Sequence, residues 1–249
     1  MTARPHDRGD AAGRIAAARR ILVITGAGVS AESGIPTFRD KGGWWKHYRP
    51  EDLATPDAFA RDPHTVWSWY DARRQGVARA EPNAGHRALA RAEAAGCRVA
   101  IVTQNVDDLH ERAGSREIAN VHGSLWQTQC TADGRVVDDR RVPLPEIPPR
   151  CACGALVRPH IVWFGERLHE PPLARIAAWL AEPWDVVLVV GTEATFGYIH
   201  EWALAAKRRG ACLVEVNPRE TSLTPACDTR LPGPAAEVLP AVLPGQSTA

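Results

Sequence analysis

No stretch of this chain is apolar over the roughly 20 residues that a membrane-spanning helix needs. The first ten residues, MTARPHDRGD, also lack the apolar core of a secretory signal peptide. These two absences predict a soluble, cytoplasmic protein without a membrane partner.

An excess of charge of one sign is missing as well. The chain carries 30 basic and 29 acidic residues, so its formal net charge is +1. A charge this small produces no broad field that would attract nucleic acid or an anionic surface. We therefore expect no nucleic-acid partner, although a local basic pocket remains compatible with this balance.

Cysteine is scarce and unevenly spread. Six cysteines in 249 residues are too few for the disulfide framework of a small secreted domain. Three of them lie between residues 130 and 153, and this cluster needs an explanation of its own.

The hydrophobic residues that are present predict an α/β fold. Four short aliphatic runs have the composition of strands that are buried on both faces of a parallel sheet: 21–25, 98–103, 186–190 and 212–216. Helical segments lie before or between them: 11–20, 85–95 and 200–209. This alternation is typical of a Rossmann-like, doubly wound sheet.

Two segments interrupt the alternation and predict a smaller inserted domain. Residues 42–82 are polar and tryptophan-rich and predict helices and loops, whereas 124–159 contain the cysteines and the proline-rich run RVPLPEIPPR. The Rossmann-like part then comprises 11–41, 83–123 and 160–243. Residues 1–10 and 244–249 are expected to be tails.

The first strand leads directly into a glycine turn. Gly26, Gly28 and Ala31 fit the pattern G-x-G-x-x-G/A at the position that a dinucleotide-binding fingerprint requires. The glycines would let the backbone approach a pyrophosphate. A tight strand-to-helix connection without a ligand explains the same residues equally well.

The residues after this turn distinguish the chain from a dehydrogenase. Gly34 and Pro36 stop any helix within two turns, so a loop with Phe38 and Arg39 replaces the long helix that a dehydrogenase has here.

Six ordered motifs together resemble those of the sirtuin (Sir2) family over about residues 15 to 243. They are GAGVSAESGIPTFRD (26–40), QNVD (104–107), VHG (121–123), RPHIVWFGE (158–166), GT (191–192) and VNP (216–218).

The resemblance implies an enzyme that uses NAD⁺ as a co-substrate. It would remove acyl groups from lysine side chains of proteins or peptides and release nicotinamide and O-acyl-ADP-ribose. The cofactor-binding residues that it implies are Gly26, Ala27, Gly28, Ser30, Ala31, Pro36, Phe38, Arg39, Trp45, Gln104, Asn105, Val106, Asp107, Gly191, Thr192, Asn217 and Cys227. Among them, Asn105 and Asp107 would line the nicotinamide pocket, and Asn217 would meet the adenine-side ribose.

His122 is the candidate general base. A histidine suits the deprotonation of a ribose hydroxyl because its ordinary pKa is about 6.5. His122 lies where the family has its base, whereas we interpret His86, on the helix expected at 85–95, as a packing residue. Asn105 and Asp107 complete the predicted catalytic set, although an aspartate after a strand also fits a cap on the next helix.

The substrate side involves two parts of the sequence. The resemblance implies that Val162, Trp163, Phe164 and Gly165 take the peptide backbone as an added strand, although their composition alone would indicate core. Tyr70 and Arg73 share a face of the expected helix and correspond to the carboxylate-binding pair of the desuccinylase and demalonylase branch. Ala54 falls where that branch has a small residue in the acyl pocket.

The metal site departs from the family pattern of two C-x-x-C pairs. Cys130, Cys151 and Cys153 remain, and Asp133 stands where another cysteine is expected. A zinc site with three cysteines and one aspartate is chemically allowed, and loss of the metal is equally compatible with these residues.

Other functions remain open from the sequence. Glu193 replaces a serine that is common in the family, and we hypothesise that it accepts a hydrogen bond from the adenine-side ribose. A plain deacetylase, an ADP-ribosyltransferase and a non-catalytic NAD or ADP-ribose binding module are the alternatives to an acidic-acyl deacylase. A dehydrogenase is the alternative that the interrupted helix disfavours.

Overall fold

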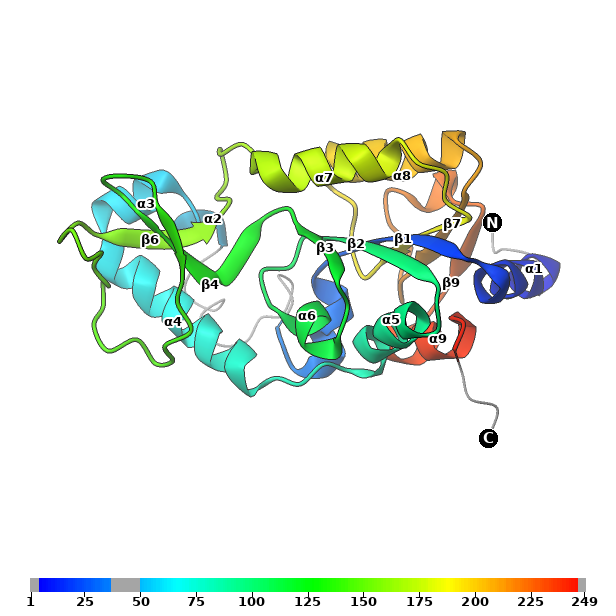
Figure 1. Cartoon of the computed structure of the whole chain (residues 1–249), viewed down its shortest axis with the longest axis horizontal. Helices are drawn as coiled ribbons and strands as arrows, with labels where there is room; N and C mark the ends of the chain where they lie inside the picture. The colour runs from blue at the N-terminus through cyan, green and yellow to red at the C-terminus, as the bar shows by residue number, and fades with distance from the viewer. Residues whose placement is uncertain (1–4, 37–49, 246–249) are drawn as a thin grey trace.

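A six-stranded parallel sheet forms the larger part of the molecule (Figure 1). The computed structural model describes residues 5–36 and 50–245. The strand order is β3-β2-β1-β7-β8-β9. The bounds are β1 Arg20–Thr25, β2 Arg98–Thr103, β3 Glu117–Asn120, β7 Val186–Val190, β8 Cys212–Val216 and β9 Thr229–Leu231.

Helices cover both faces of this sheet because its central strands are apolar on both sides. Ile21 and Val23 belong to the core on one face, while Leu22 and Ile24 belong to the core on the other. Figure 1 shows α7 and α8 above the sheet and α5 and α9 below it. The bounds of the helices are α1 Pro5–Ala17, α5 Ala84–Ala94, α6 Leu109–Ala113, α7 Glu170–Leu180, α8 Gly197–Arg208 and α9 Ala235–Val242.

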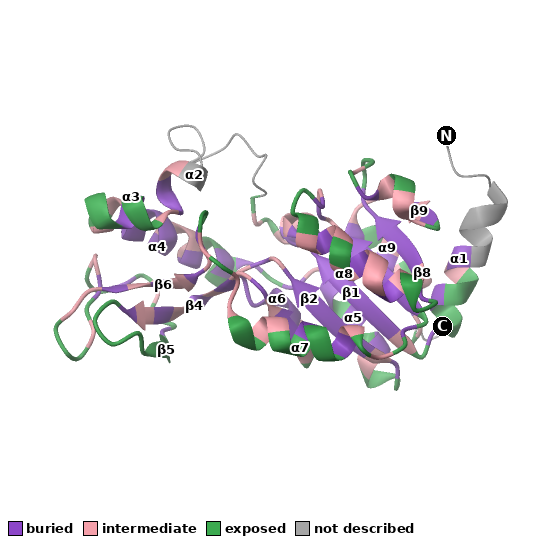
Figure 2. Ribbon diagram, turned by 90° about the horizontal axis from the view of Figure 1, so that it is seen from above, coloured by how far each residue is buried: buried purple, intermediate pink, exposed green. Residues whose placement is uncertain are grey.

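A smaller module lies at one end of the sheet (Figures 1 and 2). It combines three helices with a three-stranded antiparallel sheet of order β5-β4-β6. The bounds are α2 Pro50–Leu53, α3 Pro56–Arg61, α4 Pro63–Arg79, β4 Gly123–Cys130, β5 Val136–Asp138 and β6 Val157–Ile161. A separate hydrophobic core that includes Trp67 and Trp69 holds the helices against the strands.

Local chemistry explains where the helices of this module begin. The side chain of Thr55 accepts a hydrogen bond from the Ala58 N–H at 3.1 Å, which caps α3. Asp62 caps α4 in the same way through Thr65. Each helix also has a proline in its first turn, where no backbone donor is needed.

The predicted α/β class and the four predicted strands are confirmed, whereas the first helix and two short strands differ from the prediction. The first helix begins at Pro5 rather than Ala11 and ends at Ala17, so it includes residues expected to be a tail. Strands β3 and β9 were not predicted, because four and three residues are too short to give a clear hydrophobic pattern. Within residues 5–36 and 50–245, no helix is long and apolar enough to cross a membrane.

A pair of buried histidines lies under the carboxyl edge of the sheet. His86 and His110 are 0% and 1% exposed, and their rings meet edge-on with centroids 4.8 Å apart. His86 Nδ1 accepts a hydrogen bond from the Asn83 N–H and so completes a capping box at the start of α5. Burial lowers the pKa of His86 to about 4 and that of His110 well below its ordinary value.

These histidines make the fold sensitive to acid. Between pH 6.5 and pH 4 the unfolded chain takes up a proton at each site and the folded chain does not, which favours unfolding as the pH falls. Asp107 offsets the destabilisation that one histidine causes. Burial raises the pKa of its carboxyl to about 6, so below pH 6 the folded chain binds a proton there that the unfolded chain does not yet bind. Together these three groups should contribute a loss of about 1.4 kcal/mol of unfolding free energy per pH unit below pH 6.

Urea denaturation between pH 7 and pH 5 measures this slope. The variant His86→Gln should have a smaller slope of unfolding free energy against pH. The control variant His64→Gln changes an exposed histidine and should keep the slope of the native protein. An unchanged slope in His86→Gln would contradict the assignment.

Candidate active site

Two glycine turns meet at the carboxyl ends of β1 and β7. The Gly26 N–H donates to the Val190 carbonyl at 3.1 Å, and the Gly28 N–H donates to the Gly191 carbonyl at 2.8 Å. A Cβ on Gly28 would lie 2.8 Å from Gly191 Cα, and a Cβ on Gly26 would lie 2.7 Å from Thr192 Cβ. The close packing of two turns therefore requires these glycines, whatever ligand the turn binds.

A buried polar network follows the turn. Ser30, on the 3₁₀ helix η1 (Ala27–Ser33), donates from Oγ to Asp107 Oδ2 at 3.0 Å and accepts from Asn105 Nδ2 at 3.1 Å. Three of the predicted site residues thus form one hydrogen-bonded group at the ends of β1 and β2. All three are less than 9% exposed.

Asp107 has two roles in this network. Its Oδ1 accepts a hydrogen bond from the Leu109 N–H at 3.1 Å, at the start of α6, so the helix-cap interpretation also holds. Because burial raises its pKa to about 6, part of the population is protonated near neutral pH. A carboxyl in that range can donate as well as accept hydrogen bonds.

A second chain of hydrogen bonds joins β2, β7 and β8. Gln104 Nε2 donates to Thr192 Oγ1 at 2.9 Å, and Asn217 Nδ2 donates to the Thr192 carbonyl at 3.0 Å. The Cys227 thiol donates a hydrogen bond to the Leu223 carbonyl at 3.4 Å, and burial raises the pKa of this thiol to about 12. Glu193 forms an ion pair with Arg219 at 3.7 Å. The structure therefore gathers the residues predicted for both ends of NAD⁺ along one edge of the sheet.

The remaining cofactor residues have less defined positions. Ala31 and Val106 are partly buried next to the polar network, and Pro36 is exposed at the end of the first described segment. Phe38, Arg39 and Trp45 lie outside the described residues.

His122 lies where the sheet leads into the small module. It follows β3 and precedes β4, and it is partly buried. Its Nδ1 lies 2.9 Å from the Gln104 carbonyl, and its Nε2 lies 2.7 Å from the Tyr198 hydroxyl. A carbonyl only accepts, so Nδ1 carries the proton in the neutral ring and Nε2 is the basic atom.

Burial lowers the pKa of His122, although the hydrogen bond to Gln104 opposes this shift. The imidazole is therefore neutral at physiological pH, as a base must be before it acts. The sequence analysis did not identify Tyr198. Tyr198 follows Gly191 by seven residues, which indicates a position near this edge of the sheet. The sequence contains no feature that predicts its contact with His122.

The predicted substrate residues meet beyond His122. The Val162 N–H donates to the His122 carbonyl at 3.0 Å, and the Phe164 N–H donates to the Ala54 carbonyl at 2.9 Å. Phe164 itself is 41% exposed. The segment from Val162 to Gly165 therefore connects the base with the helices of the small module.

Tyr70 and Arg73 lie on the same side of α4. The Tyr70 hydroxyl accepts a hydrogen bond from Trp163 Nε1 at 2.8 Å. The guanidinium of Arg73 lies 4.9 Å from the Trp69 ring centroid and 5.7 Å from that of Tyr70. Within the described part of the chain, Arg73 forms no ion pair. The structure thus brings together Ala54, Tyr70 and Trp163, with a partly exposed cation beside them.

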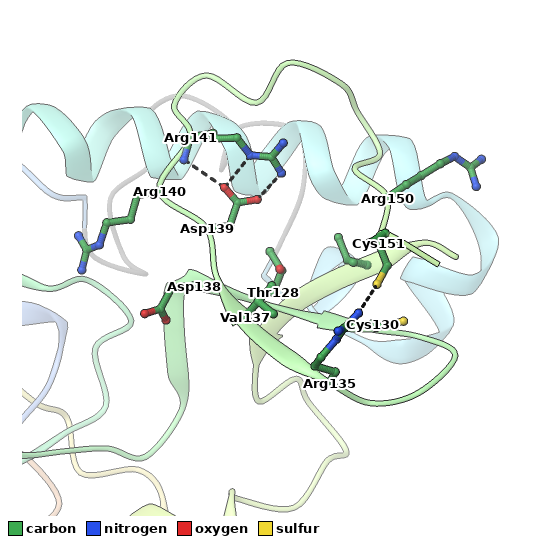
Figure 3. A pocket seen from close by; sticks show the side chains of 12 residues that line it. Thr128, Cys130, Arg135, Val137, Asp138, Asp139, Arg140, Arg141, Arg150 and Cys151 are labelled. Carbon is green, nitrogen blue, oxygen red and sulfur yellow. Dashed lines mark hydrogen bonds and ion pairs between the residues drawn. The ribbon is translucent and has the colours of Figure 1, made fainter. Parts of the chain in front are cut away.

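Three cysteines of the small module form a candidate metal site. The sulfurs of Cys130, Cys151 and Cys153 all lie within 4.8 Å of one another, with 3.6 Å between Cys130 and Cys153. Tetrahedral zinc with Zn–S bonds of about 2.3 Å would place two sulfurs about 3.8 Å apart, so this geometry fits the metal. Arg135 donates a hydrogen bond to the Cys151 sulfur at 3.5 Å (Figure 3). Hydrogen bonds with the Cys153 backbone and with Arg135 lower the pKa of Cys151 to about 7.

Asp133, the predicted fourth ligand, lies beside the cysteines, because its carboxylate interacts with the Cys130 thiol. The carboxylate also accepts a hydrogen bond from the Arg135 N–H at 2.9 Å, and it does not belong to the tightest group of potential ligand atoms among the described residues. An open pocket of about 470 Å³ lies next to Cys130 and Cys151 (Figure 3). A zinc ion held here would have three thiolates and room for water as its fourth ligand.

Removal of zinc should therefore destabilise the small module. We expect one equivalent of zinc in the purified protein by elemental analysis, and chelation should lower the melting temperature by about 2 to 4 °C per kcal/mol of lost stability. Cys153→Ser should lose the metal, while the matched Cys97→Ser, far from the cluster, should retain it. A metal-free preparation with unchanged melting would show that the cluster is not a zinc site.

Comparison with known proteins agrees with this geometry. The model of the Sir2 family matches residues 26–196. The NAD-dependent protein deacylase 2 of Pyrobaculum aerophilum is 48% identical over 231 residues, which cover 91% of this chain and 90% of that protein. A solved complex of a Sir2 homologue with NAD has a TM-score of 0.88 at 45% identity and covers 94% of this chain and 91% of its own.

A third, more distant match extends the likeness to the peptide side. A mutant Sir2 protein solved with a deacetylated p53 peptide and 3′-O-acetyl ADP-ribose has a TM-score of 0.83 at 28% identity, with 97% of both chains covered. The identity, the coverage and the agreement in fold establish that this chain belongs to the Sir2 family of NAD-dependent protein deacylases.

Proposed function

We propose that this NAD-dependent protein deacylase acts preferentially on lysines that carry acidic acyl groups, succinyl or malonyl. The observation that supports this preference most is the Tyr70 and Arg73 pair on α4, beside Trp163 and the small residue Ala54.

The electrostatics of the pair favour a carboxylate as ligand. Burial lowers the pKa of Arg73, which means that the folded protein bears a cost for keeping the cation. A bound carboxylate would offset that cost and accept two parallel hydrogen bonds from the guanidinium. The hydroxyl of Tyr70 accepts from Trp163 and so retains its own proton for a third hydrogen bond.

The sheet edge supplies the groups for the chemistry on NAD⁺. Ser30, Asn105 and Asp107 form a buried, hydrogen-bonded group that would hold the nicotinamide carboxamide away from water. After nicotinamide leaves and the acyl oxygen attacks the ribose, His122 takes the proton of a ribose hydroxyl through Nε2. The lysine amine then leaves, one water molecule adds to the acyl carbon, and the products are nicotinamide, the free lysine and O-acyl-ADP-ribose.

Two other activities fit the same pocket less well. A plain deacetylase would gain nothing from a cation next to the acyl site, and an ADP-ribosyltransferase would not need the base. The masses of the products from acylated peptides and NAD⁺ distinguish all three. A non-catalytic binding module would give no product.

His122→Ala should abolish acyl transfer. Loss of general-base catalysis lowers rates by roughly 10²- to 10⁴-fold. NAD⁺ affinity, measured by calorimetry, and the melting temperature should change little, because the side chain is partly exposed and its neighbours on the sheet edge remain. A variant with near-normal turnover of acyl-lysine peptide would exclude His122 as the base.

Arg73→Met should separate the two classes of substrate. Charge-assisted hydrogen bonds contribute about 1.5 to 3 kcal/mol each, so kcat/KM for succinyl-lysine should fall by at least about 10- to 100-fold. Turnover of acetyl-lysine should stay the same or rise, since a desolvated cation is removed.

The control is Arg79→Met, an exposed arginine in the last turn of the same helix. It should leave both substrates unaffected. Equal losses on both substrates in Arg73→Met would make Arg73 a structural residue. An unmodified enzyme that prefers acetyl-lysine would refute the acidic-acyl preference and leave the family assignment intact.

A further inference from the structure

The basic nitrogen of His122 already has a hydrogen-bond partner. A neutral imidazole has one lone pair for accepting a hydrogen bond, here on Nε2, because Nδ1–H donates to the Gln104 carbonyl. That lone pair accepts from the Tyr198 hydroxyl at 2.7 Å. A ribose hydroxyl must therefore either displace the phenol or reach the base through it.

The packing of Tyr198 opposes displacement. Its ring stacks on Phe196 with centroids 5.3 Å apart and planes 5° apart, and it contacts the Trp202 ring at 4.9 Å. Tyr198 belongs to the first turn of α8, so its backbone is fixed as well. Moving the hydroxyl away from His122 would disrupt these aromatic contacts.

The phenol has the capacity to accept a second hydrogen bond. Among the described residues, His122 is the one hydrogen-bond partner of the Tyr198 hydroxyl, and the side chain is only partly buried. The rings of Phe196 and His122 also meet edge-on, with centroids 5.9 Å apart. Phe196, His122 and Tyr198 therefore line the same side of the site. An oxygen that arrives from solvent or substrate can donate to the free lone pair of Tyr198.

We propose that Tyr198 relays the proton from the ribose hydroxyl to His122. The ribose proton moves to Tyr198 Oη while the phenolic proton moves to His122 Nε2, and the ribose oxygen forms its bond to the acyl carbon as the carbon–nitrogen π bond to the lysine opens and its electron pair moves to nitrogen. Tyr198 is neutral before and after the step, His122 becomes an imidazolium, and no further reactant is needed. This inference rests on the proposed role of His122 as base.

Burial raises the pKa of Tyr198 above its ordinary value, so a free phenolate does not form. The two proton transfers must then be concerted. This requirement gives the relay a signature that neither a structural tyrosine nor a displaced one has: two protons move in the same transition state.

Tyr198→Phe tests the relay, because it keeps the stack on Phe196 and Trp202 and removes only the hydroxyl. Single-turnover acyl transfer should slow by about 10²-fold, while exchange of labelled nicotinamide into NAD⁺, which precedes the base step, should stay within about threefold. In mixtures of H₂O and D₂O the native enzyme should show a curved dependence of the acyl-transfer rate on deuterium content. The variant should show a linear one.

Restoring the hydroxyl provides the matched control. Incorporation of 3-fluorotyrosine at position 198 should recover most of the acyl-transfer rate that phenylalanine loses. Acyl transfer within about threefold of native in Tyr198→Phe would overturn the relay, since the ribose would then reach His122 directly. Equal losses in acyl transfer and nicotinamide exchange would overturn it too, because the phenol would then be structural.

The same assays separate this inference from the proposed function. If His122→Ala retained acyl transfer, His122 would not be the base and the proposed function would fail at that residue. If His122→Ala were inactive and Tyr198→Phe fully active, only the relay would fail.

Discussion

The contact between the turns after β1 and β7 is the constraint on which the rest of the structure depends. The Gly28 N–H donates to the Gly191 carbonyl at 2.8 Å, and the two backbones approach so closely that no side chain fits between them. Gly191 also has a positive φ of 59°, which an L-residue adopts only with strain. Because the two turns are locked together, the residues that follow them meet at one edge of the sheet.

This edge carries polar groups that water would otherwise solvate. Ser30, Asn105 and Asp107 satisfy one another, and the hydrogen bonds of Gln104 and Asn217 to Thr192 continue the network toward β8. A buried polar network of this kind is rigid when every member is paired. Burial raises the pKa of Asp107 to about 6, although its hydrogen bonds to Leu109 and Ser30 oppose this shift.

His122 occupies the junction of the two parts of the molecule. Gly123, directly after it, has a φ of +82°, and a Cβ there would lie 2.0 Å from the His160 carbonyl. This glycine lets β4 pass against β6 immediately behind His122, and the Val162 N–H then bonds to the His122 carbonyl. The backbone that presents His122 is therefore continuous with the backbone that contacts Ala54 in the small module.

The sequence by itself determined the local features. Near-continuous aliphatic runs such as 186–190 specify strands buried on both faces, and the ordered motifs specify the family with its candidate residues. The sequence did not predict short strands such as β9, because three residues are too few to show a hydrophobic pattern. These features depend only on neighbours in the chain.

Tertiary structure alone decided which distant side chains meet. The hydrogen bond between Tyr198 and His122 joins residues 76 positions apart, and the bond between Trp163 and Tyr70 joins residues 93 apart. It also decided how Asp133 lies beside the cysteine cluster, where its carboxylate bonds to the Arg135 backbone and interacts with Cys130. Such contacts follow from the packing of helices and sheets against one another, and the periodicity of a single segment contains no information about them.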